Sequence, residues 1–218
     1  KWLTYTKSAD NDMSVVYVYN IASKKEHPVT EQGYSSSAPV FSTDGKYLIF
    51  TSARDFNSTY SQTEWNHVYT RMNGVYMAML AEDTPSPLLP TDGAVESPKQ
   101  EGEVVVKIDT ENLPGRIIKL PLAAGSYRNF YSDGKKVYYS AAGGTKAFDL
   151  KTQKEETVAE GASFSLTPGS KKALFVKRGQ MFVSDFPTAK ANMREAINTK
   201  DMVAHVDYMQ EWAQIFDE

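Results

Sequence analysis

The residues of this chain that could do chemistry are few and lie far apart in the sequence. Its three histidines, His27, His67 and His205, stand singly, and the chain has no cysteine. A nucleophile elbow needs Gly-x-Ser-x-Gly, but the nearest approach, Gly161–Ser165, lacks the last glycine. A phosphate-binding Gly-rich loop and a His-Glu-x-x-His metal pair are also missing. The sequence therefore predicts no catalytic residue, metal or cofactor within these 218 residues.

Three carboxylates could serve a different reaction. Glycoside hydrolysis needs two carboxylates that flank the scissile bond, and Asp55, Glu64 and Asp109 are candidates for that role. No spacing in the sequence unites them. A hydrolase with a site built from loops is therefore an alternative that activity on a panel of glycosides would have to support.

A polar and aromatic insertion, residues 54–73, contains the best candidates for binding. It carries Arg54, His67 and Arg71 among tyrosine, asparagine and tryptophan side chains. Long loops with packed aromatics are often functional, although many only cover the end of a sheet. Two interpretations stay open: these three residues contact a peptide in a channel or interface, or they hydrogen-bond within a large loop.

The elements that would position these residues are indicated by a phrase that recurs along the chain. It is clearest at Phe41–Phe50 and Phe130–Tyr139, with a weaker copy at Leu166–Phe175. Each copy has an apolar residue, an Asp-Gly or Pro-Gly turn, a lysine and an apolar-aromatic run. Glycine supplies the positive φ of a tight turn and the aromatic run suits a half-buried strand, so each copy predicts a β-hairpin.

The spacing of the copies predicts a β-propeller. Phe41 and Phe130 lie 89 residues apart, close to two periods of 45, and Lys1–Tyr5 aligns with Lys46–Phe50 at an offset of 45. Periods of about 40–45 residues with four strands each are those of propeller blades. We therefore expect an all-β fold, a partial propeller of about four blades of four-stranded antiparallel sheet with a short C-terminal helix. Because the chain opens on the second strand of a unit, we also expect it to be a piece of a longer protein.

The expected organisation has two parts. Residues 1–187 form the blades of an incomplete ring, and residues 188–218 form a polar linker with one helical turn, a short strand and a helix from Tyr208, whose apolar residues recur at helical spacing. The expected strands are Trp2–Thr6, Val15–Tyr19, Glu26–Thr30, one before Asp44, Tyr47–Thr51, Gly74–Leu80, Thr84–Pro90, Val104–Asp109, Ile117–Leu120, Lys135–Ser140, Lys146–Leu150, Glu156–Val158, Lys172–Lys177, Gln180–Asp185 and Met202–Val206.

Composition narrows the classes of partner. Aromatic residues make up 12% of the chain, which suits many short strands with one wet face better than a helical bundle. A net charge of −3 gives no electrostatic support to nucleic-acid binding. No run of 18 apolar residues is present to span a membrane. The absence of cysteine excludes a disulfide framework and thiolate metal sites, and it leaves the compartment undecided.

Four segments, in order along the chain, resemble the tricorn protease family. They are the blade phrase Ser36–Phe50; Ser52–Asn57 with Tyr60, followed by Gly74–Leu80 and Thr84–Pro87; Ile108-Asp109 with Arg116–Pro121 and Gly125–Tyr127; and Glu211–Glu218, which is similar to the start of the family's catalytic core. The last segment reads Glu-Trp-Ala-Gln-Ile-Phe-Asp-Glu.

The resemblance implies a place for this chain in a longer protein. The family has two propellers, then a serine-peptidase core split around a PDZ-like domain. This chain is similar to the later blades of the second propeller and the first helix of that core. The family's catalytic His, Ser and Glu would lie beyond Glu218, so none falls on a residue of this chain. The family's propellers are thought to guide peptides, which makes Arg54, His67 and Arg71 candidates for a substrate path.

The resemblance also implies partners and a compartment. They are the rest of the parent chain with its catalytic core, peptide substrates, and further copies in a homo-oligomer. The family is cytoplasmic; a periplasmic or secreted location stays open. The main alternative is a TolB-like propeller that binds a protein partner and belongs to no enzyme, because TolB-like propellers share the Ser36–Phe50 phrase.

Overall fold

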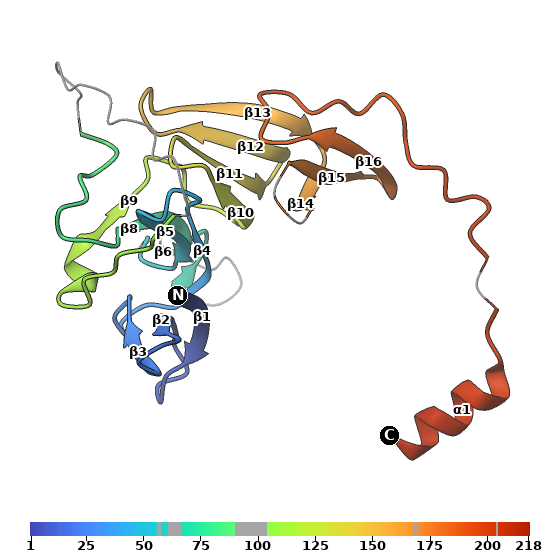
Figure 1. The fold of residues 1–218 in the computed structure, drawn as a ribbon, viewed down its shortest axis with the longest axis horizontal. Coiled ribbons are helices and arrows are strands. Elements are labelled where there is room, and N and C mark those ends of the chain that lie inside the picture. Colours follow the sequence, from blue (N-terminus) through green and yellow to red (C-terminus); the bar gives the residue numbers. More distant parts are fainter. Residues whose placement is uncertain (56–57, 61–66, 90–103, 168, 170, 204) are drawn as a thin grey trace.

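The computed structural model describes residues 1–55, 58–60, 67–89, 104–167, 169, 171–203 and 205–218, with only the backbone for 58–60 and 67–69. Within them, the strands form four antiparallel sheets that stack as blades, together with one two-stranded hairpin (Figure 1). The prediction of an all-β partial propeller with a short C-terminal helix is confirmed. Blades 2 and 3 have the expected four strands, whereas three strands are described in each of blades 1 and 4.

The blades are named in chain order. Blade 1 contains β1 (Trp2–Ser8), β2 (Ser14–Asn20) and β3 (Lys25–Pro28). Blade 2 contains β4 (Ser36–Phe41), β5 (Tyr47–Ser52), β8 (Gly74–Met79) and β9 (Ile117–Lys119). Blade 3 contains β10 (Arg128–Ser132), β11 (Lys136–Ala141), β12 (Gly144–Asp149) and β13 (Lys154–Glu160). Blade 4 contains β14 (Ser163–Leu166), β15 (Lys172–Lys177) and β16 (Gln180–Asp185).

An apolar core fills each space between consecutive blades. Strand side chains alternate between two faces, so one strand supplies two cores. In β5, Leu48 and Phe50 face blade 1, whereas Ile49 faces blade 3. In β11, Tyr139 faces blade 2 and Tyr138 faces blade 4. The cores therefore join the four blades into one stack, and the sequence alternation decides which neighbour each residue meets.

The Asp-Gly turns lock neighbouring blades together. Gly45 and Gly134 have φ of 71° and 82°, as the hairpin prediction requires. The backbone N–H of Thr43 in blade 2 donates to the carbonyl of Ser132 in blade 3 at 2.9 Å. A Cβ built on Gly134 would lie only 2.2 Å from Oδ2 of Asp44. Glycine is therefore required at residue 134 both for its own φ and for the approach of the blade 2 turn.

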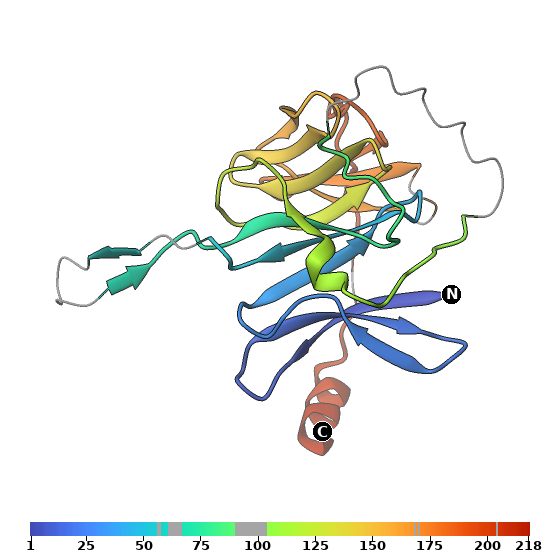
Figure 2. The same cartoon turned by 90° about the vertical axis from the view of Figure 1, so that its left-hand side faces the viewer.

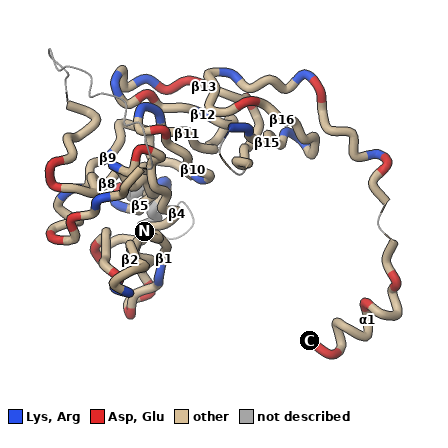
Figure 3. The backbone as a smooth tube through the Cα atoms, in the orientation of Figure 1, with Lys and Arg blue, Asp and Glu red and all other residues tan. Residues whose placement is uncertain are grey.

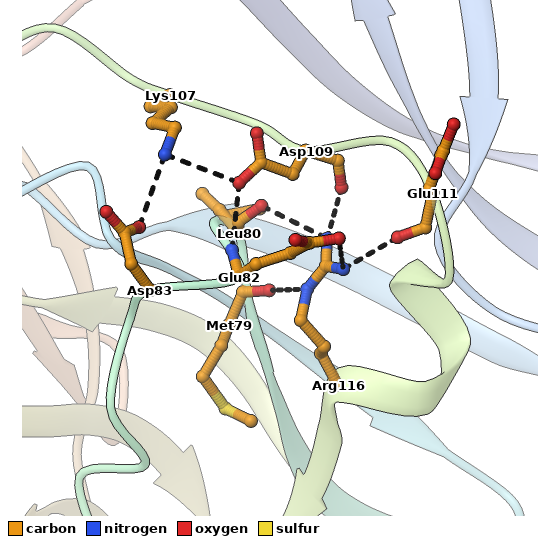
Figure 4. Close-up of polar contacts among 8 residues, drawn as sticks. All are labelled: Met79, Leu80, Glu82, Asp83, Lys107, Asp109, Glu111 and Arg116. Carbon is orange, nitrogen blue, oxygen red and sulfur yellow. Dashed lines mark hydrogen bonds and ion pairs between the residues drawn. The ribbon is translucent and has the colours of Figure 1, made fainter.

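The later part of the connector between β8 and β9, described from Val104, packs against the core between blades 1 and 2 through Val106, Ile108 and Leu113. It ends in a 3₁₀ turn, Leu113–Arg116, and Arg116 fixes it in place. The largely buried Arg116 guanidinium donates to the carbonyls of Met79 at 3.1 Å and Glu111 at 2.6 Å (Figure 4). It also reaches the carbonyls of Leu80 and Asp109. One cation thus satisfies four main-chain acceptors that no neighbouring strand reaches.

Three expected strands are wrong. Val104–Asp109 is irregular: the Asp109 N–H donates to the Leu80 carbonyl, and no strand among the described residues pairs with the segment. In the expected strand Thr84–Pro90, described as far as Leu89, prolines remove ladder donors and turn hydrogen bonds form instead. The described part of Met202–Val206 is also irregular, and Met202 donates within a turn to Thr199.

The C-terminal segment follows blades 3 and 4 before it leaves them. Ala191 donates to the carbonyl of Val158, and Ile197 donates to that of Met181. The expected single helical turn is not found in residues 188–200. The expected helix is confirmed as α1 (Tyr208–Asp217), whose first turn is capped by the Asp207 carboxylate (Figure 1). None of its residues is buried.

Candidate functional site

The insertion predicted from the sequence forms an arm at one end of blade 2. Strands β6 (Ser58–Tyr60) and β7 (His67–Tyr69) pair and project away from the blades (Figure 2). The two legs meet at the hairpin base, which comprises Arg54, Asp55, Arg71 and Met72. There the Asp55 N–H donates to the carbonyl of Met72 at 3.0 Å. His67 lies in β7, and its side chain is outside the described part of the chain.

Arg54 packs against blade 2. Its Nε donates to Oγ of Ser52 at 3.2 Å, and its guanidinium lies 5.5 Å from the centre of the Tyr76 ring. A cation over an aromatic face is attracted by the ring quadrupole. Of the two interpretations of Arg54, this geometry supports hydrogen bonding within the fold.

Asp55 anchors the hairpin base to the outer strand of blade 2. Its carboxylate accepts from Nζ of Lys119 at 2.6 and 2.7 Å and from the Tyr76 hydroxyl at 3.3 Å. Burial, together with the nearby Asp55 charge, raises the pKa of Tyr76 to about 12, so this hydroxyl keeps its proton at neutral pH. The base of the arm is therefore held on both strands that flank the insertion, through Ser52 in β5 and Tyr76 in β8.

An open groove of about 680 Å³ lies beside the hairpin base, between blades 2 and 3. The N–H of Gly125 donates to the carbonyl of Asn73 at 2.8 Å and joins the loop before β10 to the base. The described residues that line the groove are Arg71, Met72, Asn73, Ala123, Ala124, Gly125, Ser126, Tyr127, Ala141, Ala142, Lys146 and Glu155. Clefts of about 300–1,000 Å³ are the usual size of ligand sites.

One wall of the groove carries a connected set of polar groups on blade 3. Glu155 accepts hydrogen bonds from the Lys146 ammonium and the Tyr139 hydroxyl. Burial alone would raise the pKa of Glu155, but these two donors outweigh it and hold the pKa of the carboxyl below its usual value. Burial, and next the Glu155 hydrogen bond, raises the pKa of Tyr139 far above its ordinary value. Tyr127 stacks edge-on against Tyr139, with 5.3 Å between ring centres.

The other wall carries Arg71, which is exposed. Among the described residues, no hydrogen bond or ion pair engages its guanidinium. Elsewhere Lys and Arg are interspersed with Asp and Glu over the blades (Figure 3). Of the three residues expected to line a substrate path, the structure thus brings only Arg71 to the groove, and it leaves His67 untested.

The carboxylates nominated for glycoside hydrolysis do not form a pair. Asp55 lies beside Gly74, at the start of β8, whereas Asp109 hydrogen-bonds Leu80, just past its end. A six-residue strand separates the two by about 20 Å, and the reaction needs carboxylates within about 10 Å. Asp109 instead accepts from the Glu82 N–H beside Lys107 (Figure 4). Glu64 lies outside the described residues.

The described residues contain no group of three or more His, Cys, Asp or Glu side chains that could hold a metal ion. Their one α-helix is too short to cross a membrane.

Sequence reasoning missed Lys146, Glu155 and Tyr127. The first two lie on neighbouring strands of one hairpin, so their opposite charges could have indicated a cross-strand pair. Nothing local in the sequence indicates that loop 123–127 of blade 3 meets residues 71–73 of blade 2.

Comparison with known protein families matches residues 1–187 to the tricorn protease second beta propeller domain. The chain belongs to this family. It is 26% identical over its whole length to a tricorn-like protease C-terminal subunit of Sulfurisphaera tokodaii and covers 27% of that protein. It is 24% identical to tricorn protease homolog 1 of Streptomyces coelicolor and covers 23% of it. The chain thus spans about a quarter of the length of these curated tricorn relatives.

The fold agrees with that of a solved tricorn structure. The crystal structure of the tricorn protease superposes on the whole chain with a TM-score of 0.78 at 18% sequence identity, and the chain covers 23% of it. At that identity the match supports the blade architecture alone. The expected resemblance to the tricorn family is confirmed, and the curated relatives that the chain matches are longer tricorn-like proteins.

Proposed function

We propose that this chain is a non-catalytic propeller segment of a tricorn-like serine peptidase, and that it guides peptides along the groove between blades 2 and 3. Residues 1–187 are the blades, and residues 188–218 lead into the first helix of a catalytic core. The rest of the longer chain is the main partner, and that protein assembles as a homo-oligomer. Bond cleavage takes place elsewhere, on residues that this chain does not supply.

The groove beside the hairpin base carries this proposal. It lies between two blades of a family-assigned propeller, it is open, and it is lined by Arg71, whose guanidinium has no partner among the described residues. Its remaining charges, on Lys146 and Glu155, neutralise each other. Such a surface suits an extended peptide that slides past, since the alanines along it leave room for a backbone.

Helix α1 supports the proposed continuation into a second domain. Trp212 and Phe216 are 69% and 90% exposed, and Tyr208, Met209 and Ile215 are also exposed. An amphipathic helix in water is marginal unless its apolar face packs on something. A following core domain of the same polypeptide provides that surface.

The proposal can be tested by filling the groove with a bulky side chain in the longer protein. Ser126 is exposed on the groove, and Ser126→Trp would fill part of it. Ser23→Trp, at an exposed turn of blade 1, is the matched control. We expect Ser126→Trp to lower kcat/KM several-fold for fluorogenic peptides of eight or more residues and to leave a fluorogenic dipeptide unchanged.

Either of two results would count against the proposal. One is a longer protein with no peptidase activity. The other is equal kcat/KM for long peptides in the Ser126→Trp and Ser23→Trp variants, because a guiding groove cannot be filled without effect.

A further inference from the structure

The charges of the groove differ in how fully they are engaged. Lys146 is paired with Glu155, and Glu155 also accepts from Tyr139. Arg71 faces solvent, and no described carboxylate pairs with it. Among the described residues that line the groove, Arg71 is thus the cation without a partner, and Glu155, the one carboxylate, is already bound by two donors.

This imbalance selects between classes of ligand. Of the described lining residues, a basic side chain could pair with Glu155 alone, and it would have to displace the Lys146 ammonium or the Tyr139 hydroxyl. An acidic side chain would find Arg71, whose planar fork of donors matches a carboxylate. The loss of water from a part-enclosed groove strengthens such a pair compared with one on an open surface.

The backbone at Arg71 is left-handed, as it is at seven other described residues that are not glycine. Its φ is 53°, in the left-handed region that costs a residue with a Cβ about 1 kcal/mol or more. Glycine would fit this position without strain. Because Lys24 and Arg178 share this geometry, the positive φ does not by itself assign a role to Arg71, and the ligand preference of the groove depends on its charges.

We infer that the groove recognises an acidic side chain, Asp or Glu, of a passing peptide through Arg71, while the one carboxylate among its described lining residues, Glu155, is already paired with Lys146. The inference rests on the proposed function, because it names the peptide class that the same groove prefers.

The experiment measures fluorescence anisotropy with the longer protein, its peptidase blocked by a serine-directed fluorophosphonate. The probes are three labelled octapeptides that differ at one central residue, Glu, Gln or Lys. Their termini are acetylated and amidated, so that no terminal carboxylate competes for the guanidinium. The variants are Arg71→Lys, Arg71→Gln and Arg71→Gly.

Arg178 provides a matched control for the variants. It is also an exposed arginine with positive φ, 51°, but it lies at the tip of blade 4, in the turn between β15 and β16. Arg178→Gln and Arg178→Gly repeat the same chemical changes away from the groove. Any general effect of lost charge or relieved strain should be equal at the two positions.

For the wild-type protein we expect the Glu peptide to bind about fivefold more tightly than the Gln peptide, the size of one ion pair that is partly screened. Arg71→Gln and Arg71→Gly should remove that difference, Arg71→Lys should keep most of it, and the Arg178 variants should keep all of it. Equal binding of the Glu and Gln peptides, or a preference that survives Arg71→Gln, would overturn the inference and leave the proposed function standing. Failure of all three peptides to bind would overturn both.

Discussion

Leu3 and Leu48 occupy the same position in two blades, yet one is bare and the other is buried. Both follow a lysine and an aromatic residue, in Lys1-Trp2-Leu3 and Lys46-Tyr47-Leu48. Leu48 is 0% exposed against blade 1, and Leu3 is 55% exposed on the face of blade 1 that has no neighbour among the described residues.

This difference shows that a blade is only half of a folding unit. Its two apolar faces need two neighbours, as in other stacked repeats. Blades 2 and 3 have both, so β5 is buried along its whole length. Among the described residues, blades 1 and 4 have one each, and Val183 on the outer face of blade 4 is 46% exposed. Blades 1 and 2 share the Lys-aromatic-Leu pattern, so the difference between Leu3 and Leu48 comes from their neighbours.

The largest expected effect comes from truncating the two leucines. Leu48→Ala should lower the free energy of unfolding by about 3 kcal/mol, because it leaves a cavity between two blades. Leu3→Ala in the 218-residue chain should cost less than about 0.5 kcal/mol. Urea denaturation followed by tyrosine and tryptophan fluorescence measures both.

The same pair in the longer protein sharpens the comparison. If a further blade covers blade 1 there, Leu3→Ala should approach the cost of Leu48→Ala. If Leu3→Ala lowers the free energy of unfolding by the same small amount in the 218-residue chain and in the longer protein, the view that this face of blade 1 needs a neighbour is contradicted.

A smaller effect should come from the turn that joins blades 2 and 3. In Gly134→Ala the new residue would have a positive φ and its Cβ would clash with Asp44. We expect the free energy of unfolding to fall by about 2–3 kcal/mol. Gly179, with φ of 79° and no atom within 4 Å of a built Cβ, isolates the first of these costs. Gly179→Ala should cost about 1 kcal/mol in the same denaturation experiment. Equal losses would mean that the contact between the turns adds nothing.

The smallest effect should come from the groove wall. The pKa of Glu155 is lowered in the folded chain, so its stabilisation is complete above the ordinary value of 4.5 and disappears as the pH falls through the lower folded value. Because solvent screens the Lys146–Glu155 pair, Glu155→Gln should lower the free energy of unfolding at pH 7 by less than about 1 kcal/mol. Thermal melts from pH 7 to pH 3 should show the wild-type advantage shrinking below pH 4.5. An advantage that grows toward acid would contradict the direction of the shift.

Local chemistry explains which elements could be predicted. The Asp-Gly hairpins around Gly45 and Gly134 were predictable, because positive φ and aromatic alternation are local properties. Val104–Asp109 was wrong for a related reason: a run of β-branched residues describes a strand, but only a neighbour with free hydrogen-bonding groups makes one. Here Arg116 binds the carbonyl of Asp109, the last residue of the run.

The groove could be predicted only in part. Arg71 was nominated from the composition of the insertion, and it lines the groove. The opposite wall comes from Tyr127, Lys146 and Glu155, more than 50 residues further along the chain. The register of two blades brings these walls together, and no local pattern encodes that register.

The most direct test of the central claim, that peptides travel along this groove, is site-specific photo-crosslinking. A benzophenone amino acid at position 126, in the groove, is compared with one at position 23, on blade 1, in the longer protein with a fluorescent peptide. The account predicts strong labelling at position 126 that excess unlabelled peptide suppresses, and little at position 23. Equal labelling at the two positions, or labelling that competition does not reduce, would contradict it.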